Sequence, residues 1–118
     1  MKGKNEFKYK ECYLKLNEKY FAGLLPKGVI ISKSSKLKSK AGICYFNFYS
    51  NGLIKPFEIC LSEWYLKVYP YDLEGVLLHE MIHMKLKNNL HNLDFLKEVK
   101  RFDETFGIKV PIVGKIIV

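Results

Sequence analysis

The sequence has few cysteines, almost no arginine and no long apolar run, and each shortage excludes a class of protein. No apolar run approaches the roughly 20 residues that a membrane-spanning helix needs, so we expect no membrane partner. The lysine-rich residues 1–10 are not followed by an apolar stretch, which argues against a secretory signal. The three cysteines, Cys12, Cys44 and Cys60, form no C-x-x-C pair, which argues against a disulfide framework and a cysteine zinc ribbon. We expect free thiols and a reducing, cytoplasmic location.

The formal net charge of +8 comes from lysine, because Arg101 is the only arginine. Residues 1–40 contain eleven lysines and three glutamates and carry the whole excess, whereas residues 41–118 are balanced. Lysine neutralises phosphate as a point charge and gives no bidentate readout of bases. We therefore expect any DNA partner to be bound through its backbone and in a salt-sensitive way. The candidate contacts are Lys33, Lys36, Lys38 and Lys40. The alternative is a solvated, lysine-rich surface.

The 118 residues, of which 48% are hydrophobic, predict one globular domain, residues 1–118, and we expect a monomer. Periodicity and turn residues place the elements. The helices are predicted at residues 6–21, 63–69, 73–87 and 93–106, and the strands at 29–32, 41–49 and 56–61. The turn signal at residues 50–52 predicts that the last two strands pair as a hairpin. The fold class is therefore α+β, with a small three-stranded antiparallel sheet packed on helices. Residues 108–118 are predicted to add a strand or to cover the core.

The ends and the buried faces of the helices can also be predicted. Ser62, Asp72 and Asn92 are expected N-caps, and Gly107 is expected to end the last helix. Apolar residues at helical spacing predict the core-facing side of the first and last helices. These residues are Phe7, Tyr13, Leu14, Tyr20 and Phe21 in the first helix, and Leu93, Leu96, Val99 and Phe102 in the last.

The strongest chemical signal is an H-E-x-x-H motif, residues 79–83, within an apolar helical pattern. The i, i+4 spacing puts His79 and His83 on one face of the helix, where both imidazoles can reach one zinc ion. Glu80 lies one residue along, too far round to be a ligand but near enough to take a proton from a water molecule on the metal. The motif therefore predicts a catalytic metal helix, in a zincin-like arrangement.

A catalytic zinc site has three protein ligands and one open position, so a third ligand must be found. His91 is the only other histidine, and it can reach the metal only if the chain turns back at Asn88-Asn89. We prefer His91 to the carboxylates of the last helix, which can be explained as a solvated helix face. The rival carboxylates are Glu104 and, more weakly, Asp103 and Glu98.

Five segments in order resemble the SprT-like zinc metalloproteases, the family that includes the Spartan proteases acting on DNA–protein crosslinks. They are residues 78–83 (L-H-E-M-I-H), 91–95 (H-N-L-D-F, similar to H-G-x-x-F), 16–26, 41–44 (A-G-I-C) and 59–62. The resemblance covers roughly residues 12–106. It implies one zinc ion at His79, His83 and His91, with Glu80 as the catalytic acid/base. The chain departs from the family pattern in three ways: Asn92 replaces the glycine of H-G-x-x-F, the interval between His83 and His91 is short, and no C-terminal zinc ribbon follows Gly107.

The leading hypothesis is therefore zinc-dependent hydrolysis of a peptide bond in a protein substrate. A tyrosine can add electrostatic stabilisation of the developing oxyanion. The candidates are Tyr45, Tyr49, Tyr65, Tyr69 and Tyr71. The alternative function is a zinc-stabilised, basic nucleic-acid-binding module, in which the aromatic residues 44–49 stack on single-stranded bases beside the lysine segment. A toxin-like or phage-encoded protease with one dedicated substrate is a third reading.

Overall fold

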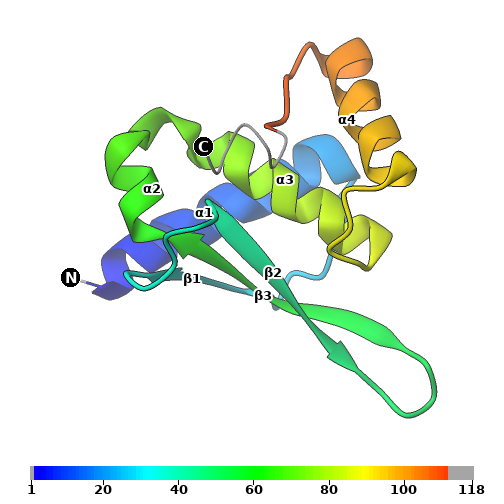
Figure 1. Ribbon diagram of the computed structural model, residues 1–118, viewed down its shortest axis with the longest axis horizontal. Coiled ribbons are helices and arrows are strands. Elements are labelled where there is room, and N and C mark those ends of the chain that lie inside the picture. Colours follow the sequence, from blue (N-terminus) through cyan, green and yellow to red (C-terminus); the bar gives the residue numbers. More distant parts are fainter. Residues whose placement is uncertain (1, 112–118) are drawn as a thin grey trace.

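The structure is a computed structural model, and it describes residues 2–111, with side chains from residue 7. This part of the chain consists of helices and one small sheet (Figure 1). The helices are α1 (Lys2–Phe21), α2 (Glu63–Val68), α3 (Leu73–Leu86) and α4 (Leu93–Phe106), with one 3₁₀ turn, η1 (Pro70–Asp72). The strands are β1 (Ile30–Ser34), β2 (Gly42–Phe48) and β3 (Ile54–Ser62). The predicted α+β class is confirmed.

The sheet is mixed, so the prediction of an antiparallel sheet is wrong for one of its two pairings. The predicted hairpin is present: β2 pairs antiparallel with β3, with a bulge between Tyr45 and Phe46. However, the strand order is β1-β3-β2, and β1 pairs parallel with β3. The reason is that residues 35–41 connect β1 to a strand that is not its neighbour. They leave a gap of one strand between β1 and β2, and β3 later fills this gap. Neighbours in sequence are usually neighbours in a sheet, but here β1 and β2 are not.

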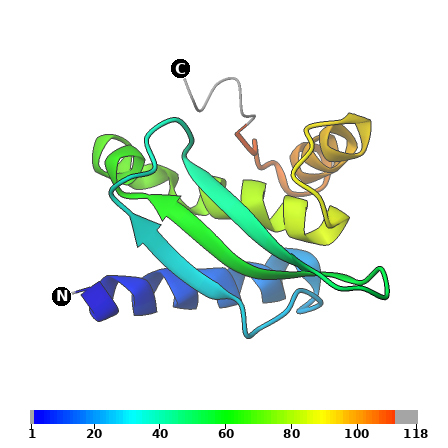
Figure 2. The same cartoon turned by 60° about the horizontal axis from the view of Figure 1, so that its bottom comes forward.

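Within residues 2–111, helices α1 and α3 together cover one face of the sheet, and no described helix covers the other (Figures 1 and 2). Side chains that alternate inward from the three strands form the floor of the core, and they include Ile31, Cys44, Ile59 and Leu61. In both views the hairpin of β2 and β3 extends beyond the helices. None of the helices described here is both long enough and apolar enough to span a membrane.

Helix α3 is the most enclosed element, and it carries the H-E-x-x-H motif. Every residue from Val76 to Met84 is buried. One side of α3 packs on β2 and β3, and other sides meet α1 and α4. A helix that is surrounded in this way places its polar side chains in the interior, where they need partners.

The predicted helix ends are largely confirmed, with one exception. The side chain of Ser62 accepts a hydrogen bond from the Tyr65 amide, and Asn92 accepts one from the Phe95 amide. Asp72 stands at the N-cap of α3 but makes no capping hydrogen bond. Its carboxylate instead accepts the Tyr65 hydroxyl, so a side-chain partner competes with the cap.

The predicted apolar faces are only partly right. In α1, Tyr13 and Phe21 are buried and Leu14 and Tyr20 are half-buried, but Phe7 is exposed. In α4, Leu93 and Leu96 are exposed, and the buried residues are Phe102 and the unpredicted Phe95. The helix is rotated because the aromatic rings of α4, rather than its leucines, fill the space against α1 and α3.

The cysteines and the segment after α4 complete the described chain. All three cysteines are free thiols, and of these Cys44 is buried. Residues 108–111 form no strand but partly cover the core, since Val110 is buried. The rest of the predicted tail, residues 112–118, lies outside the described residues.

A buried amide closes the connection between α1 and β1. Asn17 is fully buried, and its side chain donates to the Leu25 carbonyl at 3.0 Å and accepts from the Leu25 amide at 3.1 Å. These two bonds satisfy main-chain groups that the turn leaves without partners. Asn17 therefore fixes the path of the chain into the sheet.

We predict that Asn17→Ala lowers the free energy of unfolding by about 2–3 kcal/mol, because two buried main-chain groups of Leu25 lose their partners. Urea unfolding followed by circular dichroism measures the change. Glu18→Ala is the control, since Glu18 is exposed and its ion pair with Lys27 is exposed too, and it should change stability by less than about 0.5 kcal/mol. Equal effects of both substitutions would contradict the role given to Asn17.

Candidate metal centre

One turn of helix α3 and the chain reversal that follows this helix bring the three histidines together. His79 and His83 are one helical turn apart on α3 and point to the same side. His91 comes from the connection between α3 and α4, which does turn back as predicted. The residue that makes the turn is Lys87, in the left-handed conformation at φ 60°, and not an asparagine. Asn88 and Asn89 hold the turn through side-chain hydrogen bonds, including one from Asn89 to the Cys44 carbonyl of β2.

The three Nε2 atoms form a nearly equilateral triangle. The His79–His91 distance is 3.1 Å, and His83 lies 3.2 Å from each of the other two. Three nitrogens at 2.0–2.1 Å from a tetrahedral zinc ion are separated by about 3.3–3.4 Å. The separations of the donor atoms are therefore slightly shorter than, but close to, those around a bound zinc ion, and the three histidines are positioned to bind a metal ion.

Hydrogen bonds on the far side of two of the rings fix which nitrogen carries the proton. His79 Nδ1 lies 2.6 Å from the Pro111 carbonyl, and His83 Nδ1 lies 3.0 Å from the Asn88 carbonyl. A carbonyl oxygen only accepts, so both Nδ1 atoms must be the protonated donors. In a neutral ring the Nε2 atom is then unprotonated and carries a lone pair. The lone pairs of His79 and His83 face each other at 3.2 Å with no proton between them, which is unfavourable unless a cation or an N–H donor lies there.

The environment keeps these rings neutral. Burial lowers the pKa of His79 to about 4, although the Pro111 carbonyl opposes this. Burial and the neighbouring imidazoles lower the pKa of His83 to about 3. The pKa of His91 is also lowered by burial, and the charge of Lys40 adds to the effect. At neutral pH the three rings are therefore ready to bind a metal without first losing protons.

Glu80 lies beside the triangle in a nearly closed site. The residue is 4% exposed, and no hydrogen bond or ion pair joins its carboxylate to another described residue. It packs against Gly42 of β2, where an added Cβ would lie 3.4 Å from Glu80 Cγ and 3.2 Å from Val76. The missing side chain at Gly42 lets β2 approach the helix this closely. Burial raises the pKa of Glu80 to about 8, and a dication nearby would favour its charged form.

Sequence reasoning missed the ring that supports all three histidines. The Phe95 ring centroid lies 4.9 Å from His79, 4.6 Å from His83 and 4.9 Å from His91, and the contact with His83 is stacked. Phe95 is fully buried, so it limits the rotation of each imidazole. The sequence does contain a signal, the H-x-x-x-F spacing of His91 and Phe95. That the phenylalanine contacts all three histidines is visible only in the structure.

The rival third ligands are not at this centre. Each of the three carboxylates on α4 is instead paired with a lysine, and the pairs are Glu98 with Lys85, Asp103 with Lys109 and Glu104 with Lys100. None of the five candidate tyrosines forms a hydrogen bond or ring contact with the centre within residues 7–111. The Tyr65 hydroxyl, for example, is occupied by Asp72.

Comparison with known proteins agrees with this geometry. The model of the SprT-like family matches residues 9–113, which is most of the chain. The chain belongs to the SprT-like family. This family is associated with metallopeptidase-like domains. A search of curated proteins found no match.

The four candidate DNA-contacting lysines of this SprT-like chain lie on the loop between β1 and β2 or just before it. Lys33 is engaged with Glu63 at 3.4 Å, whereas Lys36, Lys38 and Lys40 are exposed. The loop is anchored where the Ser62 hydroxyl donates to the Leu37 carbonyl at 2.7 Å. The exposed aromatics Phe48 and Tyr49 lie at the opposite end of β2, so the lysines and these aromatics are not side by side as they are in the sequence (Figure 1).

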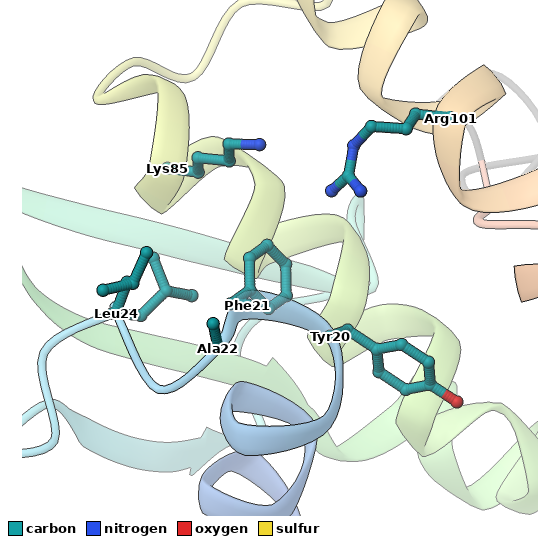
Figure 3. Close-up of a pocket in the computed structure, with 7 residues that line it drawn as sticks. Tyr20, Phe21, Ala22, Leu24, Lys85 and Arg101 are labelled. Carbon is teal, nitrogen blue, oxygen red and sulfur yellow. The ribbon is translucent and has the colours of Figure 1, made fainter. Parts of the chain in front are cut away.

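A separate surface pocket of about 250 Å³ lies between the C-terminal ends of α1 and α3 and the side of α4 (Figure 3). Its lining is mostly apolar, with Phe21 and Leu25 among the residues, and it also includes the two cations Lys85 and Arg101. Both cations bind Glu98. No residue of the metal centre lines this pocket.

We predict that one divalent metal ion binds per chain and that His91→Ala weakens its binding at least 100-fold, because one of three ligands is lost. Competition with a chromophoric chelator measures the affinity. The matched control is Glu104→Ala, which removes the rival carboxylate and should leave the affinity unchanged. Normal metal binding by His91→Ala, with loss in Glu104→Ala, would reverse the assignment of the third ligand.

Proposed function

We propose that this SprT-like protein is a zinc-dependent metallopeptidase, with His79, His83 and His91 as zinc ligands and Glu80 as the general acid/base. The observation that carries the proposal is the convergence of three imidazole Nε2 atoms beside a buried carboxylate that has no described protein partner. A purely structural zinc site is usually closed by a fourth protein ligand. Here three histidines, and no fourth candidate ligand among the described residues, come together.

The donor set favours zinc over other common metals. Neutral imidazole nitrogens suit zinc, whereas magnesium and calcium prefer oxygen ligands. The His83 and His79 rings are each oriented by a carbonyl, the arrangement that supports metal-binding histidines. Zinc, when bound, supplies Lewis-acid activation of a water molecule and of the scissile carbonyl.

Glu80 supplies the proton transfers. As water attacks the carbonyl carbon of the peptide bond, the Glu80 carboxylate takes one proton from that water. It then delivers the proton to the amide nitrogen, so that the C–N bond breaks and a neutral amine leaves. The buried position of Glu80 suits both steps, because water that would compete for the proton is largely excluded.

We predict that Glu80→Gln lowers peptide hydrolysis by about 10²- to 10⁴-fold while zinc binding is retained, because the amide keeps the shape of the carboxylate but cannot take a proton. Cleavage of a casein or histone substrate, with zinc content by atomic absorption, measures both properties. Glu104→Gln is the control and should cleave at the wild-type rate. Undiminished cleavage by Glu80→Gln would exclude this mechanism.

The substrate class that we propose is protein associated with or crosslinked to DNA. Two observations support it: the loop of Lys36, Lys38 and Lys40 is exposed, and the charge of Lys40 acts on residues of the centre. The charge of Lys40 lowers the pKa of Glu80 and of His83, which places its ammonium group within electrostatic reach of both. A DNA strand held by these lysines would therefore present its bound protein near the metal.

We predict that the triple substitution of Lys36, Lys38 and Lys40 by Gln weakens binding to single-stranded DNA and reduces the slope of log K against log salt by about 2, since three phosphate contacts are lost. Fluorescence anisotropy at several salt concentrations measures this. The control removes the same charge from α2 and α4, at Lys67, Lys97 and Lys100, and should retain most of the binding.

The same preparation separates the two candidate functions. If DNA stimulates cleavage of a histone and Glu80→Gln abolishes it, the enzyme hypothesis is supported. Salt-sensitive DNA binding by a zinc-loaded chain that cleaves nothing would favour the nucleic-acid-binding module instead. Cleavage that is independent of DNA would support the peptidase activity but contradict the proposal that its substrates are bound to DNA.

A further inference from the structure

The segment that follows α4 returns to the metal helix and contacts it at one end (Figure 1). We call residues 107–111 the C-terminal strap. Gly107, at φ 70°, reverses the chain, and the amides of Gly107 and Ile108 bond to the Asp103 and Phe102 carbonyls of α4. Val110 is buried at 4% exposure, so the strap is held at both its start and its middle.

The strap ends on the face of α3 that carries the metal ligands. Gly75 precedes His79 by four residues and therefore lies on the same helical face, one turn away. A Cβ added at Gly75 would lie 3.2 Å from both Cγ and Cδ of Pro111 and 2.9 Å from Asp72 Oδ1. The Pro111 ring thus occupies the space that any other residue at position 75 would fill.

This close approach delivers a carbonyl to the first metal ligand. With its ring packed over Gly75, Pro111 places its carbonyl oxygen 2.6 Å from His79 Nδ1. That bond holds the Nδ1 proton and leaves the Nε2 lone pair directed at the triangle. His83 has the same support from Asn88, but there the acceptor lies only five residues away, whereas Pro111 is 32 residues from His79.

We propose that Gly75 and the C-terminal strap form a positioning device for the metal centre: the glycine admits Pro111, and the Pro111 carbonyl orients His79 for metal binding. The proposal rests on the proposed function, because it concerns the same centre. Gly75 is a positioning residue here, since it touches neither metal nor substrate.

The test is a set of substitutions at the contact, made in the full chain and measured for zinc affinity by chelator competition. Gly75→Ala should weaken zinc binding by on the order of tenfold or more, which is the usual effect of losing support behind a ligand. Alanine favours the helix, so α3 itself should fold normally. Pro111→Ala keeps the carbonyl but removes Cγ and Cδ, and it should bind zinc nearly as the wild type does. Adding Pro111→Ala to Gly75→Ala should restore most of the affinity.

The matched control is Gly28→Ala, because a Cβ there meets no atom within 4 Å. A second readout is the Nδ1 proton of His79 in the NMR spectrum of the zinc-loaded protein, with the Nδ1 proton of His83 as an internal reference. We expect the His79 signal to shift or exchange faster in Gly75→Ala and to recover in the double variant, while the His83 signal is unchanged.

The outcomes separate this inference from the proposed function. A wild-type chain that binds zinc but cleaves no protein would contradict the peptidase, while a weaker affinity in Gly75→Ala would still support the strap. Unchanged affinity and an unchanged His79 signal in Gly75→Ala would overturn the strap. A loss that Pro111→Ala fails to relieve would overturn it as well, since the conflict would then lie with Asp72.

Discussion

Two imidazole nitrogens that face each other without a shared proton are the contact on which the rest of this structure depends. His79 and His83 must both use Nδ1 to donate to a carbonyl, so their Nε2 lone pairs converge at 3.2 Å. His91 brings a third nitrogen to the same point. A positive ion would resolve the repulsion, and Phe95, which packs against every ring, limits how far the imidazoles can turn away from one another. The fold thus holds three ring nitrogens in an arrangement that is suited to a metal ion.

The cost of this arrangement falls on α3, which buries two histidines and a glutamate in the middle of the core. Burying polar groups is unfavourable unless they are satisfied. The carbonyls of Pro111 and Asn88 accept hydrogen bonds from the two buried histidines and so satisfy one nitrogen of each ring. Gly42 lets the sheet approach closely enough to shield Glu80. Ligand binding to the native state adds to its stability, so a bound metal offsets some of the remaining cost. Stability and chemistry therefore depend on the same atoms.

Local patterns in the sequence predicted much of this centre, but they did not predict the contacts between residues far apart in the chain. The H-E-x-x-H spacing, the caps Ser62 and Asn92, and the turn back to His91 are local, and the structure has all of them. The parallel pairing of β1 with β3 depends on where a loop crosses the sheet, which no short pattern records. The turn itself uses Lys87 rather than an asparagine, because the hydrogen bonds of the following residues decide its geometry. The Pro111 carbonyl had no signal at all, since every residue carries a carbonyl.

The same distinction explains why the lysines and aromatics separate in space. They are neighbours in the sequence, but a strand advances about 3.4 Å per residue, so the length of β2 moves Phe48 and Tyr49 far from Lys40. A single short DNA segment cannot easily use both as one continuous surface. Lys40, by contrast, lies near enough to the metal centre for its charge to act on Glu80 and two histidines. Basic charge that acts on the centre fits a substrate that arrives on an acidic polymer better than it fits a stacking platform, which favours the proposed enzyme over the binding module.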